Sequence, residues 1–323
     1  MSVSQFTVYT GSDANGPGLI SGTAGSLLTV LDGCLVNGYT GKTAAGWTKP
    51  IANSGSIGCY KQGAGAGLNL LINDDGPNAT STFKEAWAVG WETLASIAST
   101  VGTGTGQFPL PAQLNSGNVV VRKSSAASSA GNYWVLFADA STFYLFIQTG
   151  DAAGTYYGLW FGDMFSLAGS ADTYRCFVLG NNAENGTASQ IGNLSTTPNL
   201  NPGAFSARSW GGTGSSVGIG VVGDTALDGG AAGIQGNLQS PNGPDNSFYL
   251  CPLRVTDATP LIRGRFRGLY QVCHLAANFT DGQTFAGGGD YAGKSFRIVK
   301  ALPNNASTTA FVAVETSNTV ETN

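Results

Sequence analysis

The stretch from Gly131 to Gly180 constrains the fold of this chain more than any other. It holds 13 of the 33 aromatic residues in only 50 positions. Its apolar runs are short and are bounded by Gly, Asp, Ser and Ala, which is typical of strands. Tyr133 to Ala138 and Thr142 to Ile147 are separated by three residues, so we expect them to form a β-hairpin.

Both faces of this predicted hairpin are apolar. Tyr133, Val135 and Phe137 alternate with Trp134 and Leu136. Because alternate side chains of a strand point to opposite faces, neither face can be left in water. We therefore expect the hairpin at the centre of a sandwich or barrel, covered on both sides.

The remaining sequence predicts many short strands and one helix. Apolar residues recur at helical spacing between Ser26 and Asn37, and Gly38 is placed as the stop of that helix. About a dozen apolar runs elsewhere are separated by Gly, Asn and Asp turns, whereas 102–106 and 181–216 are expected as loops. The predicted fold class is all-β, with β-sandwich or barrel-like domains of many short antiparallel strands and one short N-terminal helix.

Three segments are expected along the chain. Residues 1–40 would form an N-terminal arm and the helix, and residues 41–195 an aromatic-rich β domain. Residues 196–323 would form a second β domain or a continuation of the first. The polar, glycine-rich composition of 181–216 places this boundary.

The chain is unusually poor in charge and rich in glycine. Charged residues make up 11% of it, against roughly 25% in an ordinary soluble protein, and 48 of the 323 residues are Gly. A loop-rich β protein would have this composition, but so would a subunit whose surface is buried in an assembly, which we favour. The net charge of −4 argues against a nucleic-acid partner.

The cysteines predict reduced thiols. They are five in number, widely spaced and without a CxxC pair: Cys34, Cys59, Cys176, Cys251 and Cys273. This pattern indicates buried thiols in a reducing cytoplasm more than disulfides or metal ligands. We expect neither a secretion signal at the start of the chain nor a membrane span.

No motif predicts catalysis, a cofactor or a metal. Gly218 to Gly223 matches GxGxxG, but the strand and helix that a dinucleotide site needs are missing from its context. His274 is the only histidine and lies in an apolar run, where a structural role is the usual one. The chain is therefore expected not to be an enzyme.

Three aspartates leave a carbohydrate function open. Asp139, Asp163 and Asp172 lie at turns of the aromatic stretch, and glycosidases use two facing carboxylates. Turns are also where Asp is generally found, so the pattern is weakly specific. A glycan-binding cleft beside the aromatic residues stays an alternative.

Arg263, Arg265 and Arg267 alternate with apolar or small residues. Strand periodicity would place the three guanidinium groups on one face, while Ile262 and Phe266 could enter the core. A solvated outer face is one interpretation. The other is a subunit interface at which these arginines meet acidic groups of a neighbouring subunit.

Several stretches in one order resemble a family of tailed-bacteriophage virion structural proteins. They span most of the chain from about Leu27, and each alone is weakly specific: Gly46-Trp47-Thr48-Lys49-Pro50, Gly90-Trp91-Glu92-Thr93, Thr103-Gly104-Thr105-Gly106 with Phe108-Pro109, Thr142-Phe143-Tyr144-Leu145, Phe161-Gly162-Asp163, Arg263-Gly264 with Gly268-Leu269-Tyr270, and Glu315-Thr316-Ser317-Asn318-Thr319.

The resemblance implies a non-enzymatic structural subunit of a virion, assembled in the bacterial cytoplasm. We expect a tail or baseplate position, several copies, and other virion proteins and copies of itself as partners. A capsid-associated decoration or minor head protein is the first alternative. A protein that binds host-surface glycan during adsorption is the second.

Overall fold

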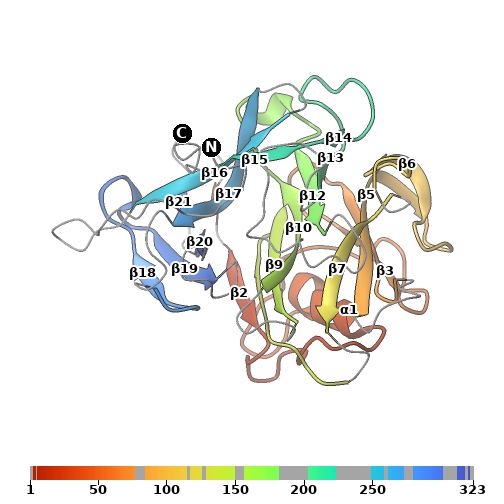
Figure 1. Cartoon of the computed structure of the whole chain (residues 1–323), viewed down its shortest axis with the longest axis horizontal. Coiled ribbons are helices and arrows are strands. Elements are labelled where there is room, and N and C mark those ends of the chain that lie inside the picture. The colour runs from red at the N-terminus through yellow and green to blue at the C-terminus, as the bar shows by residue number, and fades with distance from the viewer. Residues whose placement is uncertain are drawn as a thin grey trace.

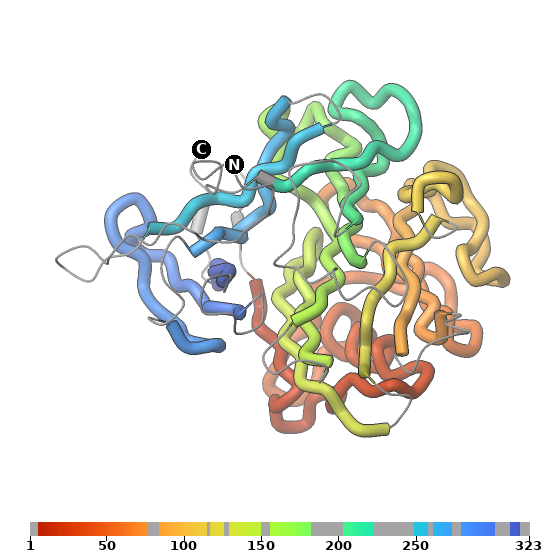
Figure 2. The backbone as a smooth tube through the Cα atoms, viewed as in Figure 1, coloured from red at the N-terminus to blue at the C-terminus, as the bar shows by residue number. Residues whose placement is uncertain are grey.

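The computed structural model describes residues 3–4, 6–76, 84–114, 117–125, 129–149, 156–181, 203–222, 249–257, 261–272, 279–300, 311–316 and 319–320. Antiparallel β-sheets dominate it, with one short α-helix near the N-terminus, which confirms the predicted fold class (Figure 1). Figure 2 shows the orange and yellow segments on one side of the yellow-green central strands and the blue C-terminal segments on the other.

A seven-stranded antiparallel sheet forms the middle layer. Its order is β14-β13-β12-β10-β9-β8-β2. The strands are β2 (Thr7–Thr10), β8 (Trp134–Ala138), β9 (Thr142–Gln148), β10 (Tyr156–Asp163), β12 (Cys176–Gly180), β13 (Gly203–Ser206) and β14 (Val217–Gly218).

The predicted hairpin is β8–β9, and Phe137 pairs with Tyr144 across it. Its two faces enter two different cores, as the alternation predicts. Trp134 and Leu136 lie in the core on one side of the sheet, and Val135 and Phe137 lie in the core on the other. The expectation that the hairpin is covered on both faces is therefore confirmed.

The first outer layer packs on the face of Trp134. It is the sheet β3-β4-β5-β6, with β7 also paired to β5, together with the helix α1. The elements are α1 (Ser26–Leu31), the π-helix η1 (Asp32–Asn37), β3 (Ile57–Lys61), β4 (Asn69–Asn73), β5 (Lys84–Ser96), β6 (Thr103–Phe108) and β7 (Val119–Ser124).

Gly38 ends this helical segment with a φ of 69°, as expected of a glycine stop. By contrast, the loop expected over 102–106 was wrong for residues 103–106, because they belong to β6 and pair with the end of β5. Strand β13 likewise lies inside the stretch 181–216 that was expected as a loop.

The second outer layer packs on the face of Val135. Its order is β15-β16-β17-β20-β19-β18, and the short β11 also pairs with β17. The elements are β11 (Phe165–Ser166), η2 (Gly169–Ala171), β15 (Gly220–Val222), β16 (Leu250–Thr256), β17 (Ile262–Val272), β18 (Thr284–Ala286), η6 (Gly289–Tyr291), β19 (Ser295–Lys300) and β20 (Phe311–Glu315).

Two connections cross the predicted segment boundaries. Strand β2, from the N-terminal arm, pairs with β8, and β13, from beyond residue 195, pairs with β12. The chain then passes from the middle sheet to the second outer sheet at Ile219, between β14 and β15. A two-stranded ribbon of β1 (Val3–Ser4) and β21 (Thr319–Val320) joins the two ends. The exact boundaries between folding units stay a prediction.

Candidate functional site

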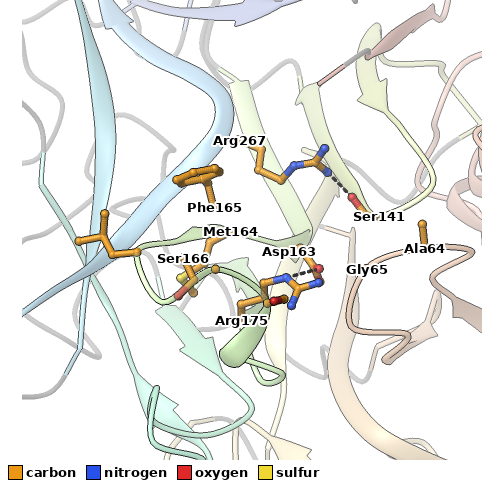
Figure 3. Close-up of a pocket in the computed structure, with 12 residues that line it drawn as sticks. Ala64, Gly65, Ser141, Asp163, Met164, Phe165, Ser166, Arg175 and Arg267 are labelled. Atoms are coloured by element: carbon orange, nitrogen blue, oxygen red, sulfur yellow. Dashed lines mark hydrogen bonds and ion pairs between the residues drawn. The ribbon is translucent and has the colours of Figure 1, made fainter. Parts of the chain in front are cut away.

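A pocket of about 700 Å³ lies at one end of the middle sheet (Figure 3). Turns and strand ends meet there, because the turns that join neighbouring antiparallel strands lie at the ends of those strands. Its walls are the loop after β3, the β8–β9 turn, the segment after β10, Arg175 just before β12, and part of β17. The lining residues are Ala64, Gly65, Ser141, Asp163, Met164, Phe165, Ser166, Leu167, Gly169, Ser170, Arg175 and Arg267.

Asp163 is the carboxylate of this pocket. It is buried, and its Oδ1 accepts a hydrogen bond from Gln62 Nε2 at 2.9 Å. Its Oδ2 accepts from Ala66 N at 3.0 Å and forms an ion pair with Arg175 Nε at 2.8 Å. Burial raises the pKa of Asp163, and the hydrogen bonds and nearby arginines only partly oppose this rise.

The loop at Gly65 can approach this carboxylate only because it has no side chain. Gly65 has a φ of +78°, and a Cβ placed on it would lie 2.3 Å from Asp163 Oδ2. A glycine is the residue that meets both demands, a left-handed backbone and close contact. The neighbouring Gly67 shares the positive φ, but a Cβ there would meet nothing within 4 Å.

Arg175 lines the pocket with a guanidinium group whose hydrogen-bond donors are only partly paired within the protein. Its Nε pairs with Asp163, and its Nη1 donates to the carbonyl oxygen of Asp172 at 3.0 Å. Arginine has five N–H donors. Within the described part of the chain, the Nη2 group has no acceptor. The side chain is 22% exposed.

Arg267 is fixed against the β8–β9 turn. Its Nη1 lies 2.8 Å from Asp139 Oδ2 and also donates to Ser141 Oγ and Thr142 Oγ1. Asp139 in turn accepts from the backbone N–H groups of Ser141 and Thr142. The turn therefore orients the Asp139 carboxylate toward Arg267 of β17.

Arg263 forms the most extensive ion pair of the region. Its Nε and Nη2 donate to the two oxygens of Asp172, both at 2.8 Å. The guanidinium also donates to Ser206 Oγ and to the carbonyl oxygens of Arg208 and Tyr174. Both charged side chains are almost completely buried. This geometry uses the planar fork of arginine in full.

The three predicted arginines thus have different surroundings. Arg263 and Arg267 meet carboxylates of their own chain, Asp172 and Asp139, and a role of either at a subunit interface stays a prediction. Arg265 is half-buried, and its guanidinium lies 5.0 Å from the centre of the Phe165 ring. Whether it contributes to a subunit interface stays a prediction.

The residues around this strand also differ from one another. Phe266 lies in the core, as predicted. Ile262 is 49% exposed instead of buried. It is the first residue of β17, at the end of the strand.

The three predicted aspartates are brought to this region, each with a different arginine. Asp139 pairs with Arg267, Asp163 with Arg175 and Asp172 with Arg263. Only Asp163 lines the pocket. A carboxylate held in this way contributes first to the fold, because its charge is neutralised and its oxygens are already hydrogen-bonded.

Arg175 and Gln62 were missed by sequence reasoning. Gln62 follows β3 and Arg175 immediately precedes β12, so no spacing connects them. The one available signal is rarity, since the chain has only 15 lysines and arginines, and a charged residue beside an apolar strand needs a partner.

The other predicted candidates carry no site. Residues 218 to 222 of the GxGxxG match form the crossing between two sheets, and Gly223 lies outside the described residues. His274 and Cys273 also lie outside them. The cysteines within them, Cys34, Cys59, Cys176 and Cys251, are buried thiols.

Two further kinds of feature are absent from the described residues. No group of three or more His, Cys, Asp or Glu side chains there is arranged to hold a metal ion. Among the helices there, none has the length and apolar character that a membrane crossing requires.

Comparison with known proteins gave no assignment. No protein-family model matches the chain, and no curated protein is significantly similar to it.

Proposed function

We propose that this chain is a non-enzymatic structural subunit of a tailed-phage virion, associated with the tail or baseplate and present in several copies. The observation that carries the proposal is a cluster of large exposed apolar side chains at one end of β17. We call it the apolar cluster. Its members are Leu167, 69% exposed, Trp210, 56%, Leu261, 57%, and Ile262, 49%.

Backbone contacts hold the members of the apolar cluster together. The N–H group of Leu167 donates to the carbonyl oxygen of Arg263, next to Ile262 in the chain. Asp257 N donates to the carbonyl oxygen of Leu261, and Asp257 Oδ2 accepts from Trp210 N. Large exposed apolar side chains near one another are a feature of protein–protein contact sites, and tryptophan is prominent among the residues that dominate binding energy there.

The surroundings of the apolar cluster also suit a subunit contact. The buried Arg263–Asp172 pair stiffens the strand beneath it, so little conformational entropy would be lost on association. Arg265 borders it, two residues from Arg263 on β17. The charge-poor composition, 11% charged residues, further favours a surface that is covered in an assembly.

The test uses purified particles of a phage that encodes the chain. Mass spectrometry should detect the protein in particles, and chemical cross-linking should connect its apolar cluster to a neighbouring subunit. Trp210→Ser should lower incorporation, whereas Tyr249→Ser, a matched control at the other end of β16, should not. Absence from particles would overturn the proposal, and normal incorporation of Trp210→Ser would overturn the contact.

Position on the particle distinguishes the alternatives. Cross-links to tail or baseplate proteins support the proposal as stated, and cross-links to the major capsid protein support a capsid-associated protein. The host-glycan alternative is favoured by one observation, the arginine-lined pocket at the end of the middle sheet.

A further inference from the structure

We propose that this pocket binds an anionic sugar unit, whose carboxylate or phosphate group is held by the outward N–H groups of Arg175. The inference rests on the pocket itself and does not depend on the place of the chain in a particle. A purely structural subunit would not need an accessible charged side chain in this pocket, whereas a ligand-binding protein would.

The first argument is the geometry of Arg175. Two of its donors are used inside the protein, Nε toward Asp163 and Nη1 toward the carbonyl oxygen of Asp172. These contacts fix the plane of the guanidinium and leave its Nη2 edge at the pocket. A planar pair of N–H donors is complementary to a carboxylate or phosphate group.

The second argument is preorganisation. Asp163, which orients Arg175, is itself held by Gln62 Nε2 at 2.9 Å and by Ala66 N at 3.0 Å. Two segments far apart in the sequence, the loop after β3 and the end of β10, therefore fix the arginine in the absence of a ligand. Such a group loses little freedom on binding, which favours affinity.

The third argument is charge. The lining contains two guanidinium groups, Arg175 and Arg267, and one carboxylate, Asp163. Asp163 and Asp139 balance these two groups, so the attraction for an anion comes from the unshared Nη2 edge of Arg175. Because burial raises the pKa of Asp163, the carboxylate would also accept a proton more readily than an exposed one when a second negative charge enters.

The fourth argument is the size and the mixed character of the walls. A free inorganic anion would occupy little of about 700 Å³, a volume in the ordinary range for small-molecule sites. Met164, Phe165 and Leu167 supply apolar surface, and Ser166 and Ser170 supply hydroxyl groups. A sugar ring has both a C–H face and hydroxyl groups, so an acidic sugar matches this lining better than a simple ion does.

An acidic peptide segment is the competing occupant. It would present a carboxylate, but a chain of residues is better matched by a long groove than by a pocket at a sheet end. A binding experiment should therefore include an acidic peptide as a separate ligand.

The experiment is isothermal titration calorimetry on the full chain at low ionic strength. The probes are glucuronate-containing tetrasaccharides, glucose 6-phosphate, a neutral tetrasaccharide, inorganic phosphate and an Asp/Glu-rich hexapeptide. Binding of the acidic sugar at least about tenfold tighter than the neutral one is expected, weakening as salt is added. Comparison of the first two probes separates carboxylate from phosphate recognition.

Two variants test the site. Arg175→Gln should weaken binding of the acidic sugar at least about tenfold, because it removes the charge and the fork. Arg208→Gln is the matched control, since Arg208 also pairs with a carboxylate, that of Glu92, but does not line the pocket. Ser170→Trp fills the pocket from an exposed position, so it should block binding even if Arg175→Gln fails to fold.

The outcomes are decisive in both directions. Tight binding of the acidic sugar that is lost in Arg175→Gln or Ser170→Trp and retained in Arg208→Gln supports the site. No heat from either acidic sugar at about 10 mM with folded protein would overturn it. So would equal binding of the neutral sugar, binding of the hexapeptide alone, or affinity that neither pocket variant changes.

Discussion

Arg263 and Asp172 lie 91 positions apart in the chain and meet in a buried fork, with Nε and Nη2 each 2.8 Å from a carboxylate oxygen. Asp172 also accepts a hydrogen bond from Ser166 Oγ at 2.9 Å. The pair joins the second outer sheet to the segment that leads into β12 of the middle sheet. It therefore connects two of the three layers at the end where the pocket lies.

Arg263→Ala should destabilise the fold strongly. The substitution leaves Asp172 buried without its positive partner, and breaking such a pair costs about 3–5 kcal/mol. Arg265→Ala is the matched control on the same strand. Its half-buried guanidinium lies over Phe165, a contact of about 0.5–1 kcal/mol. Urea unfolding measures both, and equal losses would contradict a structural role for Arg263.

Arg263→Lys separates charge from geometry. Lysine keeps the positive charge but cannot form the two parallel bonds to Asp172. We expect its free energy of unfolding to lie between those of wild type and Arg263→Ala. Full stability of this variant would indicate that the fork itself contributes nothing.

Lys123 and Asp74 predict a pH-dependent effect. Their charged atoms are 2.5 Å apart, both side chains are buried, and Asp74 also accepts from the backbone N–H of Leu27 at the start of α1. Burial raises the pKa of Asp74 above its ordinary 3.8, although Lys123 opposes this. The native state thus binds the proton of Asp74 more tightly than the unfolded state does. This difference stabilises the native state below about pH 3.8, and the stabilisation is lost as pH rises through the native pKa.

Lys123→Met should therefore cost about 3–5 kcal/mol at neutral pH, where Asp74 is left charged and buried. The cost should shrink toward about pH 4, because the pKa of Asp74 rises further without Lys123 and the carboxyl becomes neutral. Lys49→Met, which breaks the more exposed pair with Asp32, should cost no more than about 1 kcal/mol. A pH-independent cost for Lys123→Met would contradict this account.

The middle of the fold could be predicted from the sequence because its information is local. The alternation of Trp134 and Val135 assigns each side chain to one of two cores, and a strand with two apolar faces needs two covers. Gly38 likewise ends its helix through its own backbone freedom.

The site and some strands could not be predicted because their determinants are distant. Thr103–Phe108 has the composition of a loop and is a strand only because β5 extends far enough to pair with it. The sequence suggested separate roles for Arg263 and Asp172, and their contact follows from the packing of two sheets. No spacing rule connects Arg175 with Gln62 across a carboxylate between them.

The thiols give a simple chemical prediction. Burial raises the pKa of Cys34, and the thiols of Cys59 and Cys176 are buried too, so they should react slowly with a thiol reagent in the native protein. After denaturation without reductant, all five cysteines of the chain should react. A count of one or three would indicate disulfides and contradict the prediction.

The contact between Gly65 and Asp163 gives the most local test of the pocket wall. A methyl group at Gly65 would lie 2.3 Å from Asp163 Oδ2 and 3.1 Å from Ser141 Cβ. Asp163 cannot move aside without losing its bonds to Gln62, Ala66 or Arg175. The loop must shift instead, at the cost typical of overpacking, about 1–3 kcal/mol.

Gly67→Ala isolates that contact from the backbone effect. Both glycines have a positive φ, +78° and +70°, so both alanine variants share the strain of a left-handed residue. Only Gly65→Ala adds the clash, so it should be less stable than Gly67→Ala by about 1–3 kcal/mol in urea unfolding. Equal stability of the two variants would mean that the loop at Gly65 shifts without cost, because the two variants differ in what the added methyl group contacts.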